Sequence, residues 1–450
     1  ILAQDAATWS TPLEFRVLAL WDSTRKMPIP VGFIVGKDTD LVEHPQYAAL
    51  GGDASFLSDL PDKYRVDPES HEYLMDCPPG TKGQAHCDVA IAWWIKKNYP
   101  DIEVDIITPV DISLKRLKAN AMNFFMGYNN VSVTIENNAA APRMMKAFNK
   151  CGNTIPTLEL ETFISQKSLY MKACMDAGVP MAPTIFAPKD KRSPASLLRQ
   201  IKQRQWKNFV LKQSESGFSL GFLKLSVAEC EASTVLKTYF KEYASCPEFI
   251  VQEAIDGFTR NWETRCFWYN GEFLYAIANM AAVSVADGAE RIITGDDIPE
   301  EFLENAKRIG GEAIKALPPL RAPTGQEVPM VLVRTDIGCS DSAIYDKDTN
   351  WDPTQKTFFL NEIEPCSTTY FVRYLKFDCL PMYGKLYGDT ARLVAEEMKK
   401  GPVKVSRSST KARVVQKPAS AKNAVVAAKL GKGAIVKRPA KMVKTKGKSN

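Results

Sequence analysis

Carboxylates on alternate positions of two late apolar segments are the strongest chemical signal in this sequence. Arg334 and Asp336 stand two residues apart in VPMVLVRTDIG, and Glu362 and Glu364 do the same in KTFFLNEIE. Residues two apart on a strand share one face of the sheet, and acidic side chains are costly to bury without a cation. Mg²⁺ binds a few carboxylates together with phosphate oxygens. The pattern therefore predicts a magnesium site, with a structural arginine–carboxylate network as the alternative.

Two lysines indicate a phosphate group near these carboxylates. Lys167 begins a predicted helix, and Lys212 lies inside an otherwise apolar strand. A lysine in the middle of a strand is rarely buried unless it meets an anion. The segment after Lys212, QSESGFSLG, is small and rich in hydroxyl groups, so its backbone N–H groups could cover phosphates. No GxxxxGK[ST] motif occurs, and a plain hairpin turn is the alternative for this loop.

Residues from about 14 to 140 are predicted to form a parallel α/β layer. Apolar segments at 14–20, 30–35 and 103–108 have the composition of buried strands. Residues 86–98 and 111–127 have helical periodicity. Alternation of strands and helices is typical of a parallel sheet with helices on its faces.

The segment that follows is predicted to be α+β with antiparallel strand pairs. A helix at 166–178 precedes an extended segment bounded by prolines. Asn270 and Gly271 are typical of a tight hairpin turn. Further strands are expected at 209–213, 221–225, 248–255, 328–338 and 356–364, and further helices at 194–205, 227–243, 298–316 and 384–400.

Six motifs follow one another along the chain. They are Lys167 opening a helix that ends before Gly178-Val179-Pro180, Lys212 with the loop Ser214 to Gly221, Gln252-Glu253, Glu263 and Arg265 before Asn270-Gly271-Glu272, Arg334 with Asp336 and Gly338, and Asn361 to Pro365. Motifs of these types in this order, over about residues 152–395, resemble the ATP-grasp superfamily of carboxylate–amine ligases.

This resemblance implies a fold and a domain layout. It implies an α/β N-terminal domain, Rossmann-like and of the pre-ATP-grasp type, at 1–150. It implies an α+β ATP-grasp fold at 151–400, with a central and lid part at about 160–255 and a C-terminal part at about 256–400. Residues 401–450 would be a disordered Lys-rich tail.

The resemblance also implies roles for individual residues. The ATP phosphates would be held by Lys167, Lys212, Ser214, Ser216 and Gly217, and the adenine by Gln252, Glu253, Ala254 and Ile255. Two Mg²⁺ ions would be bound by Asp336, Glu362 and Glu364. Arg334 and Arg265 would be catalytic by stabilising the acyl phosphate and the oxyanion that follows, and Lys212 would be catalytic through the ATP phosphates that it holds. Many members of the superfamily have Asn where this chain has Glu364, so the alignment stays open there.

The implied activity is an ADP-forming, C–N bond-forming ligase. A carboxylate oxygen would attack the γ-phosphate of ATP, ADP would leave, and an amine would attack the acyl phosphate. The loop at 214–221 is expected to act as a lid. The partners would be small-molecule carboxylate and amine substrates or a peptide, and a homodimer stays open. The alternatives are a nucleotide-binding regulator or scaffold without ligase activity and a polyanion-binding protein acting through its tail.

The charge distribution separates the tail from the rest of the chain. The net charge is +6, but residues 401–450 carry 14 Lys or Arg and no Asp or Glu. Residues 1–400 therefore carry 44 basic against 52 acidic groups, a net charge of −8. A Lys-rich segment without aromatic residues is expected to be disordered. Three roles of this tail stay open: non-specific contact with nucleic acid or another polyanion, an inert extension, and a targeting signal.

Ten cysteines are scattered along the chain without a CxxC pair. We interpret them as reduced, mostly buried thiols, which favours a reducing compartment. Cys77, His86 and Cys87 form a loose cluster, but a zinc site there would lack a clear fourth ligand. No apolar run reaches the roughly 20 residues of a membrane span. A cytoplasmic location is expected, with the nucleus as the alternative because of the basic tail.

Overall fold

The computed structural model describes residues 27–36, 41–42, 52–67, 82–136, 139–215, 221–255, 257–258, 261–280, 292–340, 357–364, 375 and 377–400. Contacts divide the chain into residues 1–406 and 407–450. The strand expected at 14–20 and the tail at 401–450 lie outside the described residues. The same holds for Ser216 and Gly217 of the predicted phosphate loop.

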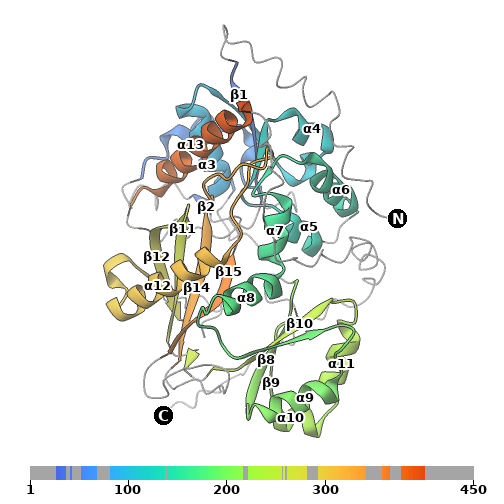
Figure 1. The fold of residues 1–450 in the computed structure, drawn as a ribbon. Helices are drawn as coiled ribbons and strands as arrows, with labels where there is room; N and C mark the ends of the chain where they lie inside the picture. Colours follow the sequence, from blue (N-terminus) through green and yellow to red (C-terminus); the bar gives the residue numbers. More distant parts are fainter. Residues whose placement is uncertain are drawn as a thin grey trace, which may run out of the picture. The chain divides into compact units, whose positions relative to one another are not determined.

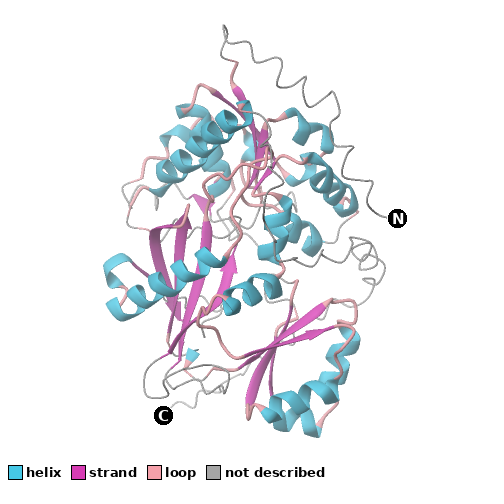
Figure 2. Cartoon of the chain, in the orientation of Figure 1, coloured by secondary structure: helices cyan, strands magenta, loops and turns pink. Residues whose placement is uncertain are grey.

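The first sheet contains four parallel strands in the order β4-β1-β5-β6. They are β1 (Ile29–Ile34), β4 (Ile102–Ile107), β5 (Met122–Phe125) and β6 (Thr154–Ile155). The side chains of β5 are all buried, as expected for a strand covered on both faces. The prediction of a parallel α/β layer is therefore confirmed (Figures 1 and 2).

The helix predicted at 111–127 is wrong in its second half. The structure has a short 3₁₀ turn η4 (Pro109–Asp111), the helix α4 (Leu114–Ala119) and then β5. Asn120 donates to Asn123 Oδ1 at 2.9 Å, and Asn123 donates to the Leu117 carbonyl at 2.9 Å. These side chains bond locally, which favours the end of a helix over its continuation. Burial between β1 and β6 then makes the following apolar residues a strand.

Besides α4, further described helices lie near this first sheet or follow it along the chain. They are α3 (Cys87–Asn98), α5 (Asn130–Glu136), α6 (Ala141–Cys151), α7 (Leu158–Ser165) and α13 (Cys379–Lys399). Helix α13 begins five residues before the helix predicted at 384–400, and it contacts α3 and β1.

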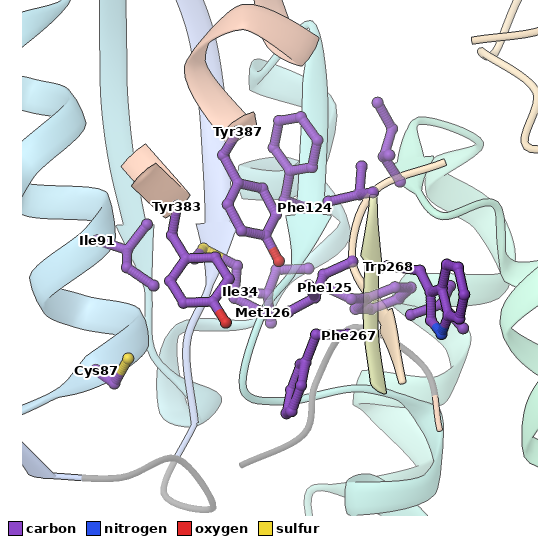
Figure 3. Packing of buried hydrophobic residues seen from close by; sticks show 14 of the residues in the cluster. Ile34, Cys87, Ile91, Phe124, Phe125, Met126, Phe267, Trp268, Tyr383 and Tyr387 are labelled. Atoms are coloured by element: carbon purple, nitrogen blue, oxygen red, sulfur yellow. The ribbon is translucent and has the colours of Figure 1, made fainter. Parts of the chain in front are cut away.

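Aromatic rings and small residues form the contacts of α13 with the first sheet and with α3. Tyr387 lies beside Phe124 of β5 (Figure 3), and the two rings meet edge-on with centroids 5.4 Å apart. A Cβ atom on Gly384 would lie 2.1 Å from the Trp94 ring, so only glycine allows this approach. By these contacts α13 packs with elements from the beginning of the chain. The domain boundaries at 150 and 400 stay predictions.

The second sheet is antiparallel, with the order β7-β10-β8-β9. The residues between 227 and 243 form two helices instead of the predicted single one, with a break at Ser233 and Thr234. The elements are β7 (Thr184–Pro188), α9 (Pro194–Gln203), β8 (Asn208–Gln213), β9 (Leu223–Ser226), α10 (Val227–Ala232), α11 (Val235–Glu242) and β10 (Glu248–Glu253).

The third sheet is also antiparallel, with the order β13-β12-β11-β14-β15. Asn270 and Gly271 both have positive φ, 51° and 81°, at the β11–β12 turn, which confirms the predicted hairpin. The segment predicted as a strand from residue 328 enters the sheet only at Val333. The elements are β11 (Trp262–Tyr269), β12 (Glu272–Met280), β13 (Ile292–Thr294), α12 (Glu300–Ala316), β14 (Val333–Ser340) and β15 (Thr357–Glu364).

Helix α12 covers one face of the third sheet. Gly310 on this helix lies against Thr335 of β14 and Trp268 of β11. Because side chains alternate along a strand, Arg334 and Asp336 lie on the opposite face. The remaining described elements are β2 (Leu41–Val42), η1 (Ser55–Leu57), η2 (Asp62–Tyr64), β3 (Ala85–His86), α8 (Lys167–Asp176) and η7 (Gly295–Asp297).

Two further expectations concern burial and membranes. The cysteines that the structure describes, eight in number, are all buried, as predicted, while Cys77 and Cys366 lie outside the described residues. In the described part of the chain, no helix is long and apolar enough to cross a membrane.

Candidate active site

The face of the third sheet opposite α12 carries the charged residues that the sequence singles out. Asp336 lies directly opposite Glu362, and Arg334 opposite Glu364, in the β14–β15 pair. Arg265 on β11 lies opposite Asp336 on the other side of β14. Directly opposed side chains are about 5 Å apart at Cβ. The sheet therefore brings these five predicted site residues to one surface.

A bulge in β15 adds a further residue to this surface. Asp336 pairs with Glu362, but the next residue, Ile337, pairs with Leu360. Asn361 is the extra residue between them, and bulges of this kind redirect a side chain. The Asn361 side chain consequently reaches β11, two strands away.

Cations face the predicted metal-binding carboxylates. The Arg334 guanidinium donates to both carboxylate oxygens of Asp336, at 2.7 and 2.8 Å, and both side chains are buried. Burial acts to lower the pKa of Arg334, but the charge and hydrogen bonds of Asp336, together with the charges of Glu364 and Glu263, raise this pKa above its usual value. Lys167, the first residue of α8, forms an ion pair with Glu362. Arg265 Nε lies 3.9 Å from Asp336 Oδ2.

Lys212 is a cation without a counter-charge in direct contact. It lies on β8 opposite Ile250, which belongs to the large core, whereas its neighbour Leu211 packs in the separate core of the second sheet. Its ammonium group makes no hydrogen bond or ion pair with any described residue. Burial, with a smaller contribution from the charge of Lys167, lowers the pKa of Lys212 to about 7, and the charge of Glu263 opposes this change. An anion at this position would satisfy the ammonium group.

Backbone hydrogen bonds hold the two lysines near each other. The Lys167 N–H donates to the Ser214 carbonyl at 2.8 Å, which fixes the start of α8 at the end of β8. Burial lowers the pKa of Lys167, while Glu364 and Asp336 act to raise it. Within the described part of the chain, the buried hydroxyl groups of Ser168 and Ser214 have no hydrogen-bond partner. These hydroxyl groups leave polar capacity beside both lysines.

The predicted adenine segment is already bonded in part to the chain itself. The Gln252 side chain donates to Thr184 Oγ1 at 3.1 Å. The Glu253 and Ala254 N–H groups donate to the carbonyl groups of residues 183 and 208, each at 3.0 Å. A base at this hinge would therefore not be bound by these two N–H groups.

An apolar cluster lies beside this hinge. Ile255 and Phe258 pack against the buried residues Ala182 and Phe359, and the two phenylalanine rings are tilted at 5.7 Å between centroids. Such a cluster is suited to the face of a flat base. Phe359 could not be singled out from the sequence, because it is one apolar residue among several in β15.

The donor chemistry fits magnesium and phosphate. Among the described residues, no group of three His, Cys, Asp or Glu side chains could hold a metal ion alone. Mg²⁺ requires only one or two protein carboxylates when phosphate oxygens supply the other ligands. The opposed carboxylates Asp336 and Glu362, near Lys167 and Lys212, form a donor set of this kind. The role of Glu364 as a third ligand stays a prediction.

Three polar residues near the site had no role predicted from the sequence. Glu263 and Asn361 are motif residues, and their closeness in sequence to Arg265 and Glu362 was the available signal. Glu161 on α7 gave no signal, because Glu159 precedes it on the same helix and looks equivalent. Glu161 is fully buried, whereas Glu159 is exposed. Burial raises the pKa of Glu161 to about 7, and the charge of Glu364 adds to this effect.

Comparisons with known proteins bear on the fold. No protein-family model matches the sequence, and no curated protein matches it. The solved structure of D-cycloserine synthetase DcsG matches 80% of this chain and 99% of its own, with a TM-score of 0.50 and 12% identity. At this identity the likeness shows the fold.

Two other solved structures cover a similar share of the chain. D-alanine–D-alanine ligase from Bacillus anthracis, complexed with ATP, covers 82% of this chain and 99% of its own, with a TM-score of 0.44 and 14% identity. The ATP-grasp ligase PsnB, complexed with a phosphomimetic variant of its minimal precursor, Mg and ADP, also covers 82% of this chain and 99% of its own. Its TM-score is 0.44 and its sequence identity is 12%.

Proposed function

The chain has the fold of the ATP-grasp superfamily, and from it we propose an ATP- and Mg²⁺-dependent ligase that joins a carboxylate to an amine. One observation carries this proposal. Lys212 is a partly buried ammonium group without a hydrogen bond or ion pair in the described part of the chain, and it lies near Lys167 and the carboxylate face. A cation that requires an anion and carboxylates that suit Mg²⁺ are the two halves of a site for Mg-ATP.

The lysines would bind and orient the triphosphate. Lys212 reaches it from β8, and Lys167 from the start of α8, so the phosphates would lie between the second and third sheets. Lys167 would exchange its ion pair with Glu362 for phosphate oxygens, which frees that carboxylate for the metal. Bound Mg²⁺ would neutralise the charge that spreads over the γ-phosphate during transfer.

The reaction would proceed in two transfers. A substrate carboxylate oxygen forms a bond to the γ-phosphorus as the bond to the β-phosphate oxygen breaks, which releases ADP and leaves an acyl phosphate. The amine nitrogen then bonds to the acyl carbon, phosphate leaves with its electron pair, and the nitrogen loses a proton. Arg334 stays charged throughout because Asp336 raises its pKa, so it can stabilise the negative oxygen that forms at the acyl carbon.

The activity can be tested before the substrates are identified. ADP release from Mg-ATP is measured with pools of amino acids and small carboxylates, each with and without an amine. We expect ADP release that depends on one acid–amine pair. ADP release from no pool, with Mg-ATP binding retained, would favour a nucleotide-binding protein without ligase activity.

Two substitutions on β15 test the metal assignment. Glu362→Gln keeps the shape of the side chain but removes the charge, so it should abolish ADP release while the thermal unfolding curve stays cooperative. Glu364→Asn introduces the residue that many ATP-grasp proteins have there, and it should retain ADP release. Full activity in Glu362→Gln would refute the role of this carboxylate.

A further inference from the structure

Glu263 connects two strands that are not neighbours in the third sheet. Its carboxylate accepts a hydrogen bond from Asn361 Nδ2 at 2.7 Å and one from Arg265 Nη2 at 3.3 Å, each on a different oxygen. Arg265 is on the same strand, β11, while Asn361 is on β15, with β14 between them. Glu263 is 6% exposed, so both hydrogen bonds are largely shielded from water.

The bulge in β15 is what makes this connection. Without the bulge, the strict alternation of side chains along β15 would place the Asn361 side chain on the α12 face of the sheet, opposite to Glu362. The bulge brings Asn361 to the site face, and its amide then reaches Glu263. The Asn361 amide and the Arg265 guanidinium thus hold the carboxylate between them.

Arg265 has a second carboxylate within reach. Its Nε lies 3.9 Å from Asp336 Oδ2, while Asp336 already accepts two hydrogen bonds from Arg334. If Glu263 did not hold the guanidinium, Arg265 could approach Asp336 fully and compete with a metal ion for it. The hydrogen bond from Nη2 to Glu263 therefore helps to keep Arg265 at this distance from Asp336.

We propose that Glu263 is a positioning residue, which, with Asn361, holds the Arg265 guanidinium toward the γ-phosphate end of the nucleotide and away from Asp336. This inference rests on the proposed function for the nucleotide. Glu263 acts through Arg265, so it does not need to touch the nucleotide itself.

Two substitutions separate positioning from charge. Glu263→Asp keeps the negative charge near Lys212 but retracts the carboxylate, and Glu263→Gln keeps the size but places an amide against Arg265. If Glu263 positions Arg265, both variants should lower the affinity for Mg-ATP by about tenfold, the effect of losing one hydrogen bond to a charged group. The affinity for Mg-ADP should change less. Calorimetry measures both affinities, and Glu272→Gln, an exposed site on the same hairpin, serves as the control. A wild-type affinity in Glu263→Asp, or equal losses for Mg-ATP and Mg-ADP, would overturn the proposal.

A double-mutant cycle tests whether Glu263 acts through Arg265. In the Arg265→Ala background, Glu263→Asp should cause no further loss of Mg-ATP affinity, because its target is absent. Losses that add would contradict the proposed connection.

Failure of the proposed function gives a different result. A wild-type chain that does not bind Mg-ATP refutes that function and, with it, any role of Glu263 toward the nucleotide. If the wild type does bind, urea unfolding of Glu263→Gln, Asn361→Ala and the double variant checks the hydrogen bond itself. Effects on the free energy of unfolding that are not additive support the connection, and additive effects refute it.

Discussion

Replacing Glu161 by glutamine should stabilise the protein above pH 7. The Glu161 side chain is fully buried on α7. The Ser165 hydroxyl donates to Oε1 at 3.2 Å, and Oε2 has no hydrogen-bond partner in the described part of the chain. Burial raises the pKa of this carboxyl group from 4.5 to about 7, with a further contribution from Glu364.

The sign of the pH dependence follows from this pKa. Because the pKa is higher in the folded than in the unfolded chain, the folded protein binds more protons between about pH 4.5 and pH 7. The favourable contribution is complete below pH 4.5 and is lost as the pH rises through 7. An increase of this size in the pKa of Glu161 corresponds to about 3 kcal/mol in the free energy of unfolding.

Urea unfolding at pH 5 and pH 8, without nucleotide or metal, measures this effect. Glu161→Gln has no titrating group, so its advantage over the wild type should grow by up to about 3 kcal/mol between these pH values. Glu159→Gln, an exposed site on the same helix, should follow the wild type. Ser165→Ala removes a hydrogen bond that lowers the pKa of Glu161, so it should cost more stability at pH 8 than at pH 5. Parallel pH profiles for Glu161→Gln and the wild type would refute the reasoning.

Three other predictions concern the nucleotide, the packing of α13 and the tail. The pKa of Lys212 is about 7, so Mg-ATP binding at pH 8 should take up a proton, which calorimetry in buffers of different ionisation enthalpy detects and Lys212→Met should abolish. Gly384→Ala places a Cβ 2.1 Å from the Trp94 ring and should destabilise the fold by about 1–3 kcal/mol; an unchanged unfolding midpoint would contradict the packing of α13 on α3. Deletion of residues 401–450 should retain ADP release and remove binding to a nucleic-acid column, and loss of ADP release would place the domain boundary elsewhere.

Features with a local cause could be predicted from the sequence. Lys167 does begin a helix, and Lys212 does lie in a strand, because the apolar pattern and flanking residues mark both elements. The Asn270-Gly271 turn requires positive φ angles that these residues adopt easily. The shared face of Arg334 and Asp336 follows from the period of two in a strand.

Features that depend on distant contacts could not be predicted in this way. Residues 122–125 continue a helical pattern, yet they form the strand β5 because β1 and β6 supply hydrogen-bond partners on both sides. Helix α13 packs against α3, nearly 300 residues earlier, through glycines that the sequence alone does not distinguish from other helical glycines.

The sequence by itself determined which residue types the site contains. The tertiary structure decided the burial of these side chains, their pKa values and their hydrogen-bond and ion-pair partners. A bulge, which no periodicity encodes, turned Asn361 toward Glu263. The absence of an ion partner for Lys212 among the described residues, and the complete burial of Glu161, result from how separate sheets and helices meet. Hydrophobic pattern and turn chemistry act over a few residues. Solvation and electrostatic interaction depend on every group nearby in space, and the chain must fold before those groups are near.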